Sequence, residues 1–306
     1  ARLASLGGPC DKHGVVTHEF PHVLNVIGAG IEPAAFLPLL ARQGEPQRLG
    51  ANAFDVPFEG DARAVLAAAR AVAPWLDVNV LPSANRRKQL LIADMDSTII
   101  ACECLDELAD MAGIKPRIAA ITARAMNGEI AFEPALRERV ALLKGLPLAA
   151  LERAYAERVR LNAGAATLVA TRRRHGAHTV LVSGGFTFVS ERVTREAGCH
   201  EHRANTLLHD GEVLTGEVAE PILGRDAKLK ALEETARKLG IGPDAVLAVG
   251  DGANDLAMIA RAGLGVAFRA KPIVADAAAA SIAHGDLTAL LYLQGIKQEE
   301  FVLPSP

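Results

Sequence analysis

The chain has 306 residues, of which 50% are apolar and 23% are charged, and its formal net charge is −3. This balance is typical of a globular protein and excludes a disordered chain. Only 4% of the residues are aromatic and positive charge is not in excess, so neither nucleic acid nor an anionic membrane is an expected partner. At about 150 residues per domain, the length predicts two domains with room for an insertion.

Cysteine usage and hydropathy indicate a cytoplasmic protein. The chain contains only Cys10, Cys102, Cys104 and Cys199. Their spacing is not that of a zinc site, and four cysteines are too few for a disulfide framework in a chain of this length. No run of 18 apolar residues is present, and the first ten residues do not follow the pattern of a signal peptide.

Residues 1–50 show one helix-like stretch, Pro33–Arg42, and no other clear periodicity. A short strand is then predicted at Phe54–Phe58, a helix at Asp61–Val72 that Asp61 caps, and a strand at Leu76–Leu81. The polar residues 83–88 read as a linker. We therefore predict a small N-terminal α/β module over residues 1–85.

At residue 89 the pattern changes to a continuous apolar strand, Gln89–Ala93, of the kind that parallel sheets bury on both faces. The segment from about 103 to 160 is instead helical, and breaks that contain glycine divide it into four parts. The predicted helices are Cys104–Ala112, Arg117–Met126, Glu133–Leu143 and Leu148–Val159. Four short helices with short connections predict a small helical bundle.

Strands and helices alternate again after residue 163. The predicted helices are Ala165–Arg174, Thr187–Ala197, Asp226–Leu239 and Asp255–Ala262, and the predicted strands are Thr179–Val182, Ala245–Val249 and Leu264–Phe268. Asp210-Gly211 lies between two apolar pairs and predicts a tight hairpin. The alternation predicts an α/β fold with a doubly wound parallel sheet over residues 89–306, which the helical segment at about 103–160 interrupts.

Three of the predicted strands end in polar clusters. In open parallel sheets, ligands bind at the carboxyl ends of the strands. Each cluster alone is as typical of a turn or a helix cap as of a ligand site. Together, however, the clusters would bring at least four carboxylates into one crevice, where they would repel one another. A divalent cation removes this repulsion, and Mg²⁺ prefers carboxylate, water and phosphate oxygens. The clusters are Asp94-Met95-Asp96-Ser97-Thr98, Ser183-Gly184-Gly185 and Gly250-Asp251-Gly252-Ala253-Asn254-Asp255.

In this order the clusters resemble the motifs of the haloacid dehalogenase superfamily of phosphatases. Asp94 to Thr98 resembles the first motif, Ser183 the second, a lysine within residues 224–230 the third, and residues 250–255 the fourth. Residues 94–103, 125–128, 137–140, 182–186 and 249–255 resemble the phosphoserine phosphatases in particular. The resemblance covers about residues 89–290 and implies a haloacid dehalogenase-like core.

The resemblance implies catalysis through an aspartyl-phosphate. Asp94 would be the nucleophile, and Asp96 would protonate the leaving oxygen and then deprotonate water. Mg²⁺ would be held by Asp94, by the backbone carbonyl of Asp96 and by Asp251, and Asp255 would orient a water on the metal. The remaining motif residues would bind the phosphoryl group, and they are Ser183, Gly184, Lys228 and Asn254.

Two lysines compete for the third motif, because Lys228 and Lys230 point about 200° apart on a helix. The spacing of Lys228 from Asp251 suits the family pattern, so we assign Lys228 to the site and expect Lys230 to be solvated.

The same resemblance assigns substrate choice to the helical segment at about 103–160, which would be an inserted cap. Glu103 would pair with the ammonium group of phosphoserine, and Arg139 would bind its carboxylate through a bidentate contact. Without the resemblance, both residues would read as surface charges of helices. Met126 and Phe132 would line the apolar side of the pocket, although their types fit core packing equally well. The cap would close over the substrate and exclude water.

The expected function is therefore Mg²⁺-dependent hydrolysis of O-phospho-L-serine to L-serine and phosphate, the last step of serine biosynthesis. Two alternatives stay open: a phosphotransferase that passes the phosphoryl group to homoserine or another alcohol, and a regulatory protein phosphorylated on Asp94. Residues 54–81 are compatible with half of a degenerate ligand-binding domain of the ACT type. A role for this module in homodimerisation or serine regulation also stays open.

Overall fold

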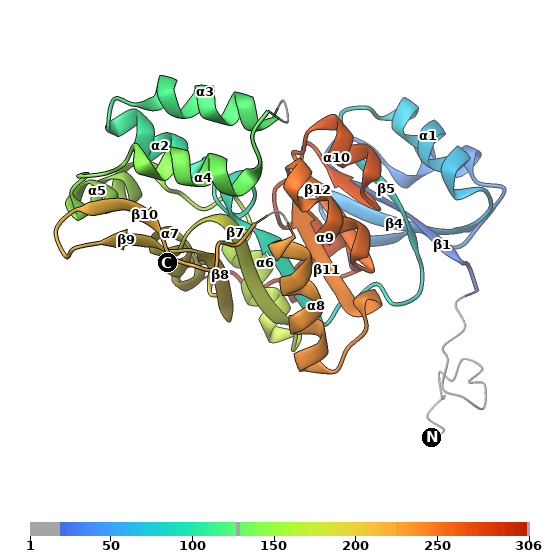
Figure 1. Cartoon of the computed structure of the whole chain (residues 1–306). Coiled ribbons are helices and arrows are strands. Elements are labelled where there is room, and N and C mark those ends of the chain that lie inside the picture. Colours follow the sequence, from blue (N-terminus) through green and yellow to red (C-terminus); the bar gives the residue numbers. More distant parts are fainter. Residues whose placement is uncertain (1–18, 127–128, 225, 305–306) are drawn as a thin grey trace.

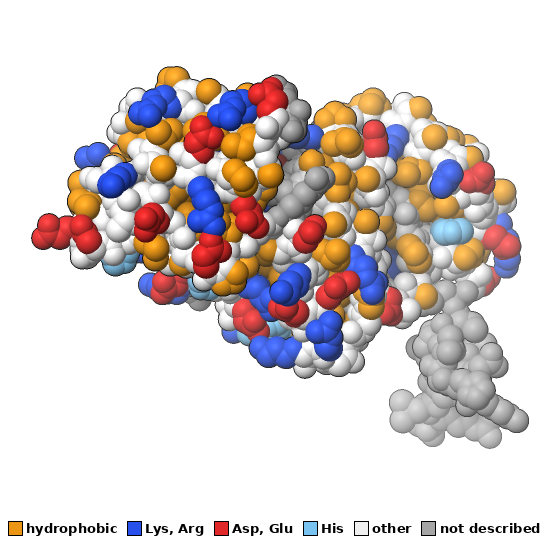
Figure 2. Space-filling model, viewed as in Figure 1, with side chains coloured by type: hydrophobic (Ala, Val, Ile, Leu, Met, Phe, Trp, Pro, Cys, Tyr) orange, Lys and Arg blue, Asp and Glu red, His pale blue; other side chains and the backbone are white. Residues whose placement is uncertain are grey.

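The computed structural model describes residues 19–126, 129–224 and 226–304, so Cys10 lies outside the described residues. Figure 1 shows a central sheet with a helical cap on one side and the N-terminal module on the other. No helix of the described residues is long and apolar enough to cross a membrane. On the face in Figure 2, positive and negative side chains are interspersed over the cap and the core.

The central sheet has six parallel strands in the order β13-β12-β11-β6-β7-β8. The predicted α/β class with a parallel sheet is thus confirmed. The strands are β6 (Leu90–Asp94), β7 (His178–Phe186), β8 (Glu201–Asn205), β11 (Val246–Gly250), β12 (Leu264–Phe268) and β13 (Ala280–Ile282).

Helices cover both faces of this sheet, because alternate residues of each buried strand point to opposite sides. On one face, Leu91 and Leu181 join a core cluster with α6 and α7; on the other, Ile92 and Val180 join a cluster with α8. The helices of the central domain are α6 (Ala165–Arg174), α7 (Thr187–Ala197), α8 (Ala227–Leu239), α9 (Leu256–Arg261), α10 (Pro272–Ala277) and α11 (Ala289–Leu293).

The cap contains the four predicted helices together with a hairpin from the later part of the chain. The hairpin strands β9 and β10 share an apolar cluster with cap residues such as Leu136 and Leu151. Its backbone also pairs with the cap, since Gly145 N–H donates to the Leu214 carbonyl over 2.8 Å. The elements are α2 (Cys104–Met111), α3 (Lys115–Met126), α4 (Phe132–Ala141), α5 (Leu148–Arg158), β9 (Leu207–His209) and β10 (Leu214–Val218).

The N-terminal module is an antiparallel sheet with strand order β2-β4-β1-β5, to which β3 is added beside β4. The predicted helix at Pro33–Arg42 is wrong: two short 3₁₀ helices, Pro33–Ala35 and Leu37–Leu39, stand in its place, because Pro38 lacks the N–H that a continuous α-helix needs. The elements are β1 (His22–Ile27), β2 (Arg42–Gln43), β3 (Gln47–Gly50), β4 (Ala53–Glu59), α1 (Ala62–Val72) and β5 (Asp77–Pro82).

Side chains of β5 join the module to the edge of the central sheet. The Asn79 amide donates to the Ser281 carbonyl (3.2 Å) and accepts from the Ser281 N–H (2.8 Å). The Asp77 carboxylate accepts from the backbone N–H groups of residues 283–285 over 2.7–3.0 Å. These contacts satisfy backbone groups of β13, the edge strand of the central sheet, and of the three residues that follow it.

Candidate active site

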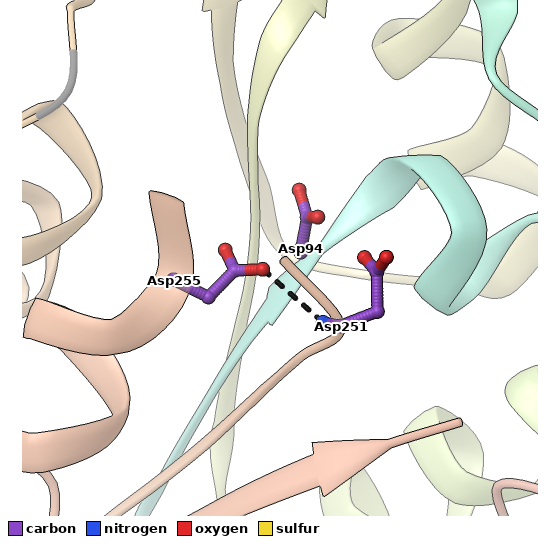
Figure 3. Close-up of side chains that lie close together, drawn as sticks. All are labelled: Asp94, Asp251 and Asp255. Atoms are coloured by element: carbon purple, nitrogen blue, oxygen red, sulfur yellow. Dashed lines mark hydrogen bonds between the residues drawn. The ribbon is translucent and has the colours of Figure 1, made fainter. Parts of the chain in front are cut away.

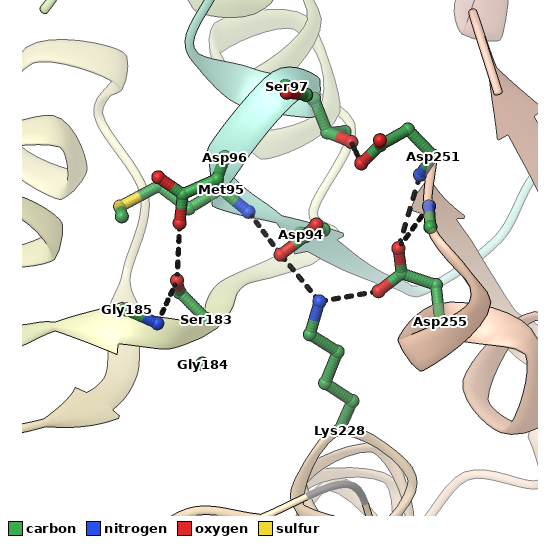
Figure 4. A network of polar contacts seen from close by, with 12 residues as sticks. Asp94, Met95, Asp96, Ser97, Ser183, Gly184, Gly185, Lys228, Asp251 and Asp255 are labelled. Atoms are coloured by element: carbon green, nitrogen blue, oxygen red, sulfur yellow. Dashed lines mark hydrogen bonds and ion pairs between the residues drawn. The ribbon is translucent and has the colours of Figure 1, made fainter. Parts of the chain in front are cut away.

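The carboxyl ends of β6, β7 and β11 meet the start of α8, and there the polar clusters of the sequence come together (Figure 4). Asp94 is the last residue of β6 and is 4% exposed. The chain then turns sharply through residues 95–99, where Ser97 has φ +56°. This turn directs Asp94 and Asp96 to different partners.

Asp94 is one of three carboxylates that could hold a metal ion. One oxygen each from Asp94, Asp251 and Asp255 lie within 4.8 Å of one another (Figure 3). Lys228 Nζ lies 2.6 Å from Asp94 Oδ1 and 2.5 Å from Asp255 Oδ1. The second oxygen of Asp255 accepts from the backbone N–H groups of Asp251 (3.1 Å) and Gly252 (3.0 Å). Asp255 therefore already has protein donors on both of its oxygens.

The charges of this group do not balance, because three carboxylates face one buried lysine. Burial, together with repulsion from Asp255 and Asp96, raises the pKa of Asp94 well above its ordinary value despite the attraction of Lys228. Burial and repulsion from Asp255 also raise the pKa of Asp251. Burial alone would lower the pKa of Lys228, but attraction to Asp94 and Asp255 raises it. Lys228 therefore stays protonated, and the three carboxylates carry more negative charge than its ammonium group neutralises, which favours the binding of a cation.

Asp96 lies between the end of β7 and the start of α2. Its Oδ2 accepts a hydrogen bond from the Ser183 hydroxyl (2.9 Å), and its Oδ1 accepts from the Cys104 N–H (3.0 Å). The Gly185 N–H donates to the Ser183 oxygen over 2.8 Å. A carboxylate in this position can give a proton to a group beside Asp94 and take one back.

The cap contributes opposite charges at the same opening. Glu103 precedes α2 and accepts a hydrogen bond from the Ser97 hydroxyl (2.7 Å). Burial and repulsion from Asp96 raise the pKa of Glu103. Arg139 lies on α4, where burial lowers its pKa against the attraction of Asp106 and Glu103. Glu103 is exposed and Arg139 is partly buried, and their opposite charges attract each other.

The remaining predicted residues lie around this centre. Phe132 lies beside Gly184 on β7, since a Cβ built on Gly184 would be 3.5 Å from the Cζ atom of Phe132. Asn254 is exposed in the turn before α9. Met126 ends α3, and its side chain lies outside what the structure describes. Lys230 is 76% exposed and pairs with Glu234.

Sequence reasoning missed two residues of this neighbourhood. The Thr98 hydroxyl donates to Asp251 Oδ1 (3.3 Å), and the buried Asn205 amide donates to the Gly184 carbonyl (3.0 Å). Thr98 stands in the first motif and its type could have drawn attention to it. Asn205 ends a polar edge strand, and nothing in the neighbouring sequence marks it.

Comparisons with known proteins agree with this geometry. Residues 91–260 match the family model described as haloacid dehalogenase-like hydrolase. A phosphoserine phosphatase of Polaromonas sp. is 46% identical over 229 residues, which cover 72% of this chain and 97% of that protein. A phosphoserine phosphatase of Archaeoglobus fulgidus is 45% identical over 217 residues, and there the match spans 70% of this chain and 63% of the relative.

One solved structure extends the likeness beyond residues 91–260. A hydrolase of the same family from Salmonella enterica serovar Typhi superposes with a TM-score of 0.81 at 29% identity, covering 91% of this chain and 99% of that one. A substrate-bound phosphoserine phosphatase superposes with a TM-score of 0.62 at 38% identity, covering 67% and 97%. The chain therefore belongs to the haloacid dehalogenase-like hydrolase family, where its resemblance to the phosphoserine phosphatases is confirmed.

Proposed function

We propose that this chain is a phosphatase that hydrolyses O-phospho-L-serine to L-serine and inorganic phosphate. One observation carries the proposal: a buried carboxylate, Asp94, is held beside Lys228, while a second carboxylate, Asp96, is held by Ser183 on the opposite side. This arrangement supplies a nucleophile, a proton donor and a cation for the phosphoryl group within one opening. The relatives named phosphoserine phosphatase support the choice of reaction.

The residues divide the reaction into two displacements. Asp94 attacks phosphorus, and the bond from phosphorus to the serine oxygen breaks as Asp96 gives that oxygen a proton. Asp96 then takes a proton from a water whose oxygen attacks the phosphorus of the aspartyl-phosphate, and Asp94 leaves as a carboxylate. Lys228, the Ser183 hydroxyl and the Gly184 N–H would stabilise the phosphoryl oxygens in both steps, with Asn254 at the edge.

We infer that the metal is Mg²⁺, held by Asp94, the Asp96 carbonyl and Asp251. The fit rests on hard oxygen donors, their proximity and the uncompensated negative charge of the cluster. When bound, Mg²⁺ would lower the repulsion between the carboxylate nucleophile and a phosphate dianion. Asp255 stays outside this set, because Lys228 and two backbone N–H groups already use its oxygens.

Glu103 and Arg139 would recognise the two ends of the amino acid. Glu103 would bind the ammonium group and Arg139 the carboxylate, and Phe132 would cover the apolar side with Met126. We further propose that the chain divides into a module at 1–85 and a phosphatase domain at 89–306, whose cap at about 103–160 closes over the substrate.

A substrate panel tests the proposal. Phosphate release would be measured from phosphoserine, phosphothreonine, sugar phosphates and nucleotides, each with Mg²⁺ and with a chelator. The expected result is the highest kcat/KM for phosphoserine and no turnover with the chelator. A preference for a sugar phosphate would refute the substrate assignment. Phosphohomoserine formed on addition of homoserine would instead identify a phosphotransferase.

A further inference from the structure

Asn205 lies between Gly184 on β7 and the segment that leads to Lys228. It is the last residue of β8 and is 2% exposed. Its Nδ2 donates to the Gly184 carbonyl (3.0 Å) and lies 3.4 Å from the Leu223 carbonyl, while its Oδ1 accepts from the Leu223 N–H (2.8 Å). One buried amide thus joins two segments that both supply groups to the site.

The bond to Gly184 fixes the orientation of one peptide plane. The carbonyl of Gly184 and the N–H of Gly185 belong to the same peptide group, which is planar with these two bonds pointing in opposite directions. An acceptor held by Asn205 on one side therefore directs the Gly185 N–H to the other side. There it donates to the Ser183 oxygen over 2.8 Å.

The same chain of hydrogen bonds ends on the expected acid and base. Because the Ser183 oxygen accepts from Gly185, its own proton points to Asp96 Oδ2, 2.9 Å away. Each donor in such a series polarises the next one. The series runs from Asn205 through the peptide between Gly184 and Gly185 to Ser183 and Asp96 (the last four residues are drawn in Figure 4).

We propose that Asn205 is a positioning residue for phosphoryl transfer, acting through the Gly184–Gly185 peptide to orient Ser183 and, through it, Asp96. The proposal rests on the proposed function, because it assigns Ser183 and Asp96 to the chemistry. Asn205 itself touches neither the nucleophile nor the phosphoryl group. Loss of its amide leaves the Gly184 peptide free to rotate, and a small misplacement of such a group slows the reaction more than it weakens substrate binding.

Asn205→Asp and Asn205→Ala test this role. The aspartate keeps the shape and the acceptor for Leu223, but it removes the donor to Gly184. The matched control is Asn79→Ala: Asn79 is 1% exposed and its amide also pairs with a backbone N–H and a backbone carbonyl, those of Ser281 on β13, three strands from β6. Activity is expressed per folded molecule, and the folded fraction is measured by circular dichroism below the melting temperature of each variant.

The expected result is a fall in kcat of about 10- to 100-fold in both Asn205 variants, with the KM for phosphoserine within about 3-fold of wild type. Asn79→Ala should lose stability but keep its kcat. A double-mutant cycle with Ser183→Ala distinguishes this positioning role from a merely structural one, because it compares the effect of Asn205→Asp on kcat with and without the Ser183 hydroxyl. If Asn205 acts through Ser183, then Asn205→Asp should reduce kcat by less than about 2-fold in the Ser183→Ala background.

Three outcomes would overturn the proposal. The first is a kcat per folded molecule within about 2-fold of wild type. The second is a fall in kcat on Asn205→Asp that is as large in the Ser183→Ala background as in wild type. The third is failure of both Asn205 variants to fold, which would make Asn205 a residue of stability alone. If wild type prefers another phosphate ester, the proposed substrate fails, and the same cycle measured with that ester still decides the role of Asn205.

Discussion

Two buried polar clusters in this molecule differ in how completely the protein neutralises them. The active-site cluster consists of Asp94, Lys228, Asp251 and Asp255. The docking cluster, which joins the N-terminal module to the central domain, consists of Asn25, Asp55 and Arg86 with the backbone carbonyls of residues 292 and 293. Both place carboxylates where water is scarce, and such groups are costly unless they are paired.

The charged groups of the docking cluster are paired within the protein. Arg86 Nη1 lies 2.5 Å from Asp55 Oδ2, and its Nη2 and Nε each donate to a backbone carbonyl over 3.0 Å. Asn25 donates to the other oxygen of Asp55 over 2.7 Å. One carboxylate faces one guanidinium, whereas in the active-site cluster three carboxylates face one lysine. Excess negative charge thus distinguishes the cluster that we propose binds a cation from the cluster that joins the N-terminal module to the central domain.

The most severe test of this difference is Asp94→Asn. We expect phosphate release to fall by about 10⁴-fold or more, because an amide cannot form the acyl phosphate. The fold should persist, since the change lowers the negative charge of the cluster and Lys228 keeps Asp255. Phosphate release and the melting temperature measure the two effects. Substantial residual activity would show that Asp94 is not the nucleophile.

The docking cluster should respond in the opposite way. Arg86→Met leaves the buried Asp55 without its cation, so we expect a loss of about 3–5 kcal/mol in the free energy of unfolding and an unchanged kcat per folded molecule. Arg87→Met is the control, because the side chain of Arg87 is 53% exposed and pairs with Glu300 at the surface; it should cost less than about 1 kcal/mol. Denaturant unfolding measures both, and equal losses would contradict the comparison.

The two clusters also differ in how far the sequence could predict them. The active-site cluster lies in continuous motifs, and the unbroken apolar strand Leu90–Ala93 places Asp94 at the end of a buried strand. The docking cluster joins residues 30 and 31 positions apart to the end of α11, more than 200 positions away. Asn25 interrupts the apolar pattern of β1 because its partner lies on β4, so the strand itself was missed.

Long-range pairing likewise explains what was missed in the cap and the central sheet. The turn at Asp210-Gly211 predicts a hairpin from local chemistry, but the apolar partners that hold it on the cap lie far earlier in the chain: Leu136 and Leu151 precede Leu214 by 78 and 63 residues. Strand β8 reads Glu201-His202-Arg203-Ala204-Asn205, which has no apolar period. As an edge strand it is only partly buried, so the sequence carries little sign of it.

A divalent cation should stabilise the active-site cluster in a pH-dependent manner. The raised pKa values of Asp94 and Asp251 mean that the metal-free native state binds protons which the unfolded chain has released. Their contribution to stability therefore falls as pH rises above the ordinary carboxylate value. Mg²⁺ binds the ionised form, so the stabilisation it gives should grow with pH.

At a Mg²⁺ concentration of 100 times Kd, the expected gain is about 2.7 kcal/mol once the carboxylates are ionised. Melting curves with Mg²⁺ and with a chelator, recorded at several pH values, measure it. Asp251→Asn should remove most of the gain. The Arg86→Met variant should keep it, since Asp94 and Asp251 are unchanged. A gain that is independent of pH, or that persists in Asp251→Asn, would place the cation elsewhere.

The smallest expected effect concerns Glu103, where the cap meets the active-site cluster. Glu103→Gln should raise the KM for phosphoserine by about 10- to 100-fold, the size of one hydrogen bond to a charged group, and leave an ester without an ammonium group, such as 3-phosphooxypropionate, unaffected. Burial and repulsion from Asp96 raise the pKa of Glu103. As the pH is lowered, Glu103 should therefore take up a proton at a higher pH than an ordinary glutamate does, and the preference of the wild type for phosphoserine should be lost there. Steady-state kinetics on both esters across pH measure this, with Glu107→Gln on α2 as the control. If both esters weaken together as the pH falls, the titrating group belongs to the carboxylates around Asp94, and Glu103 does not bind the ammonium group.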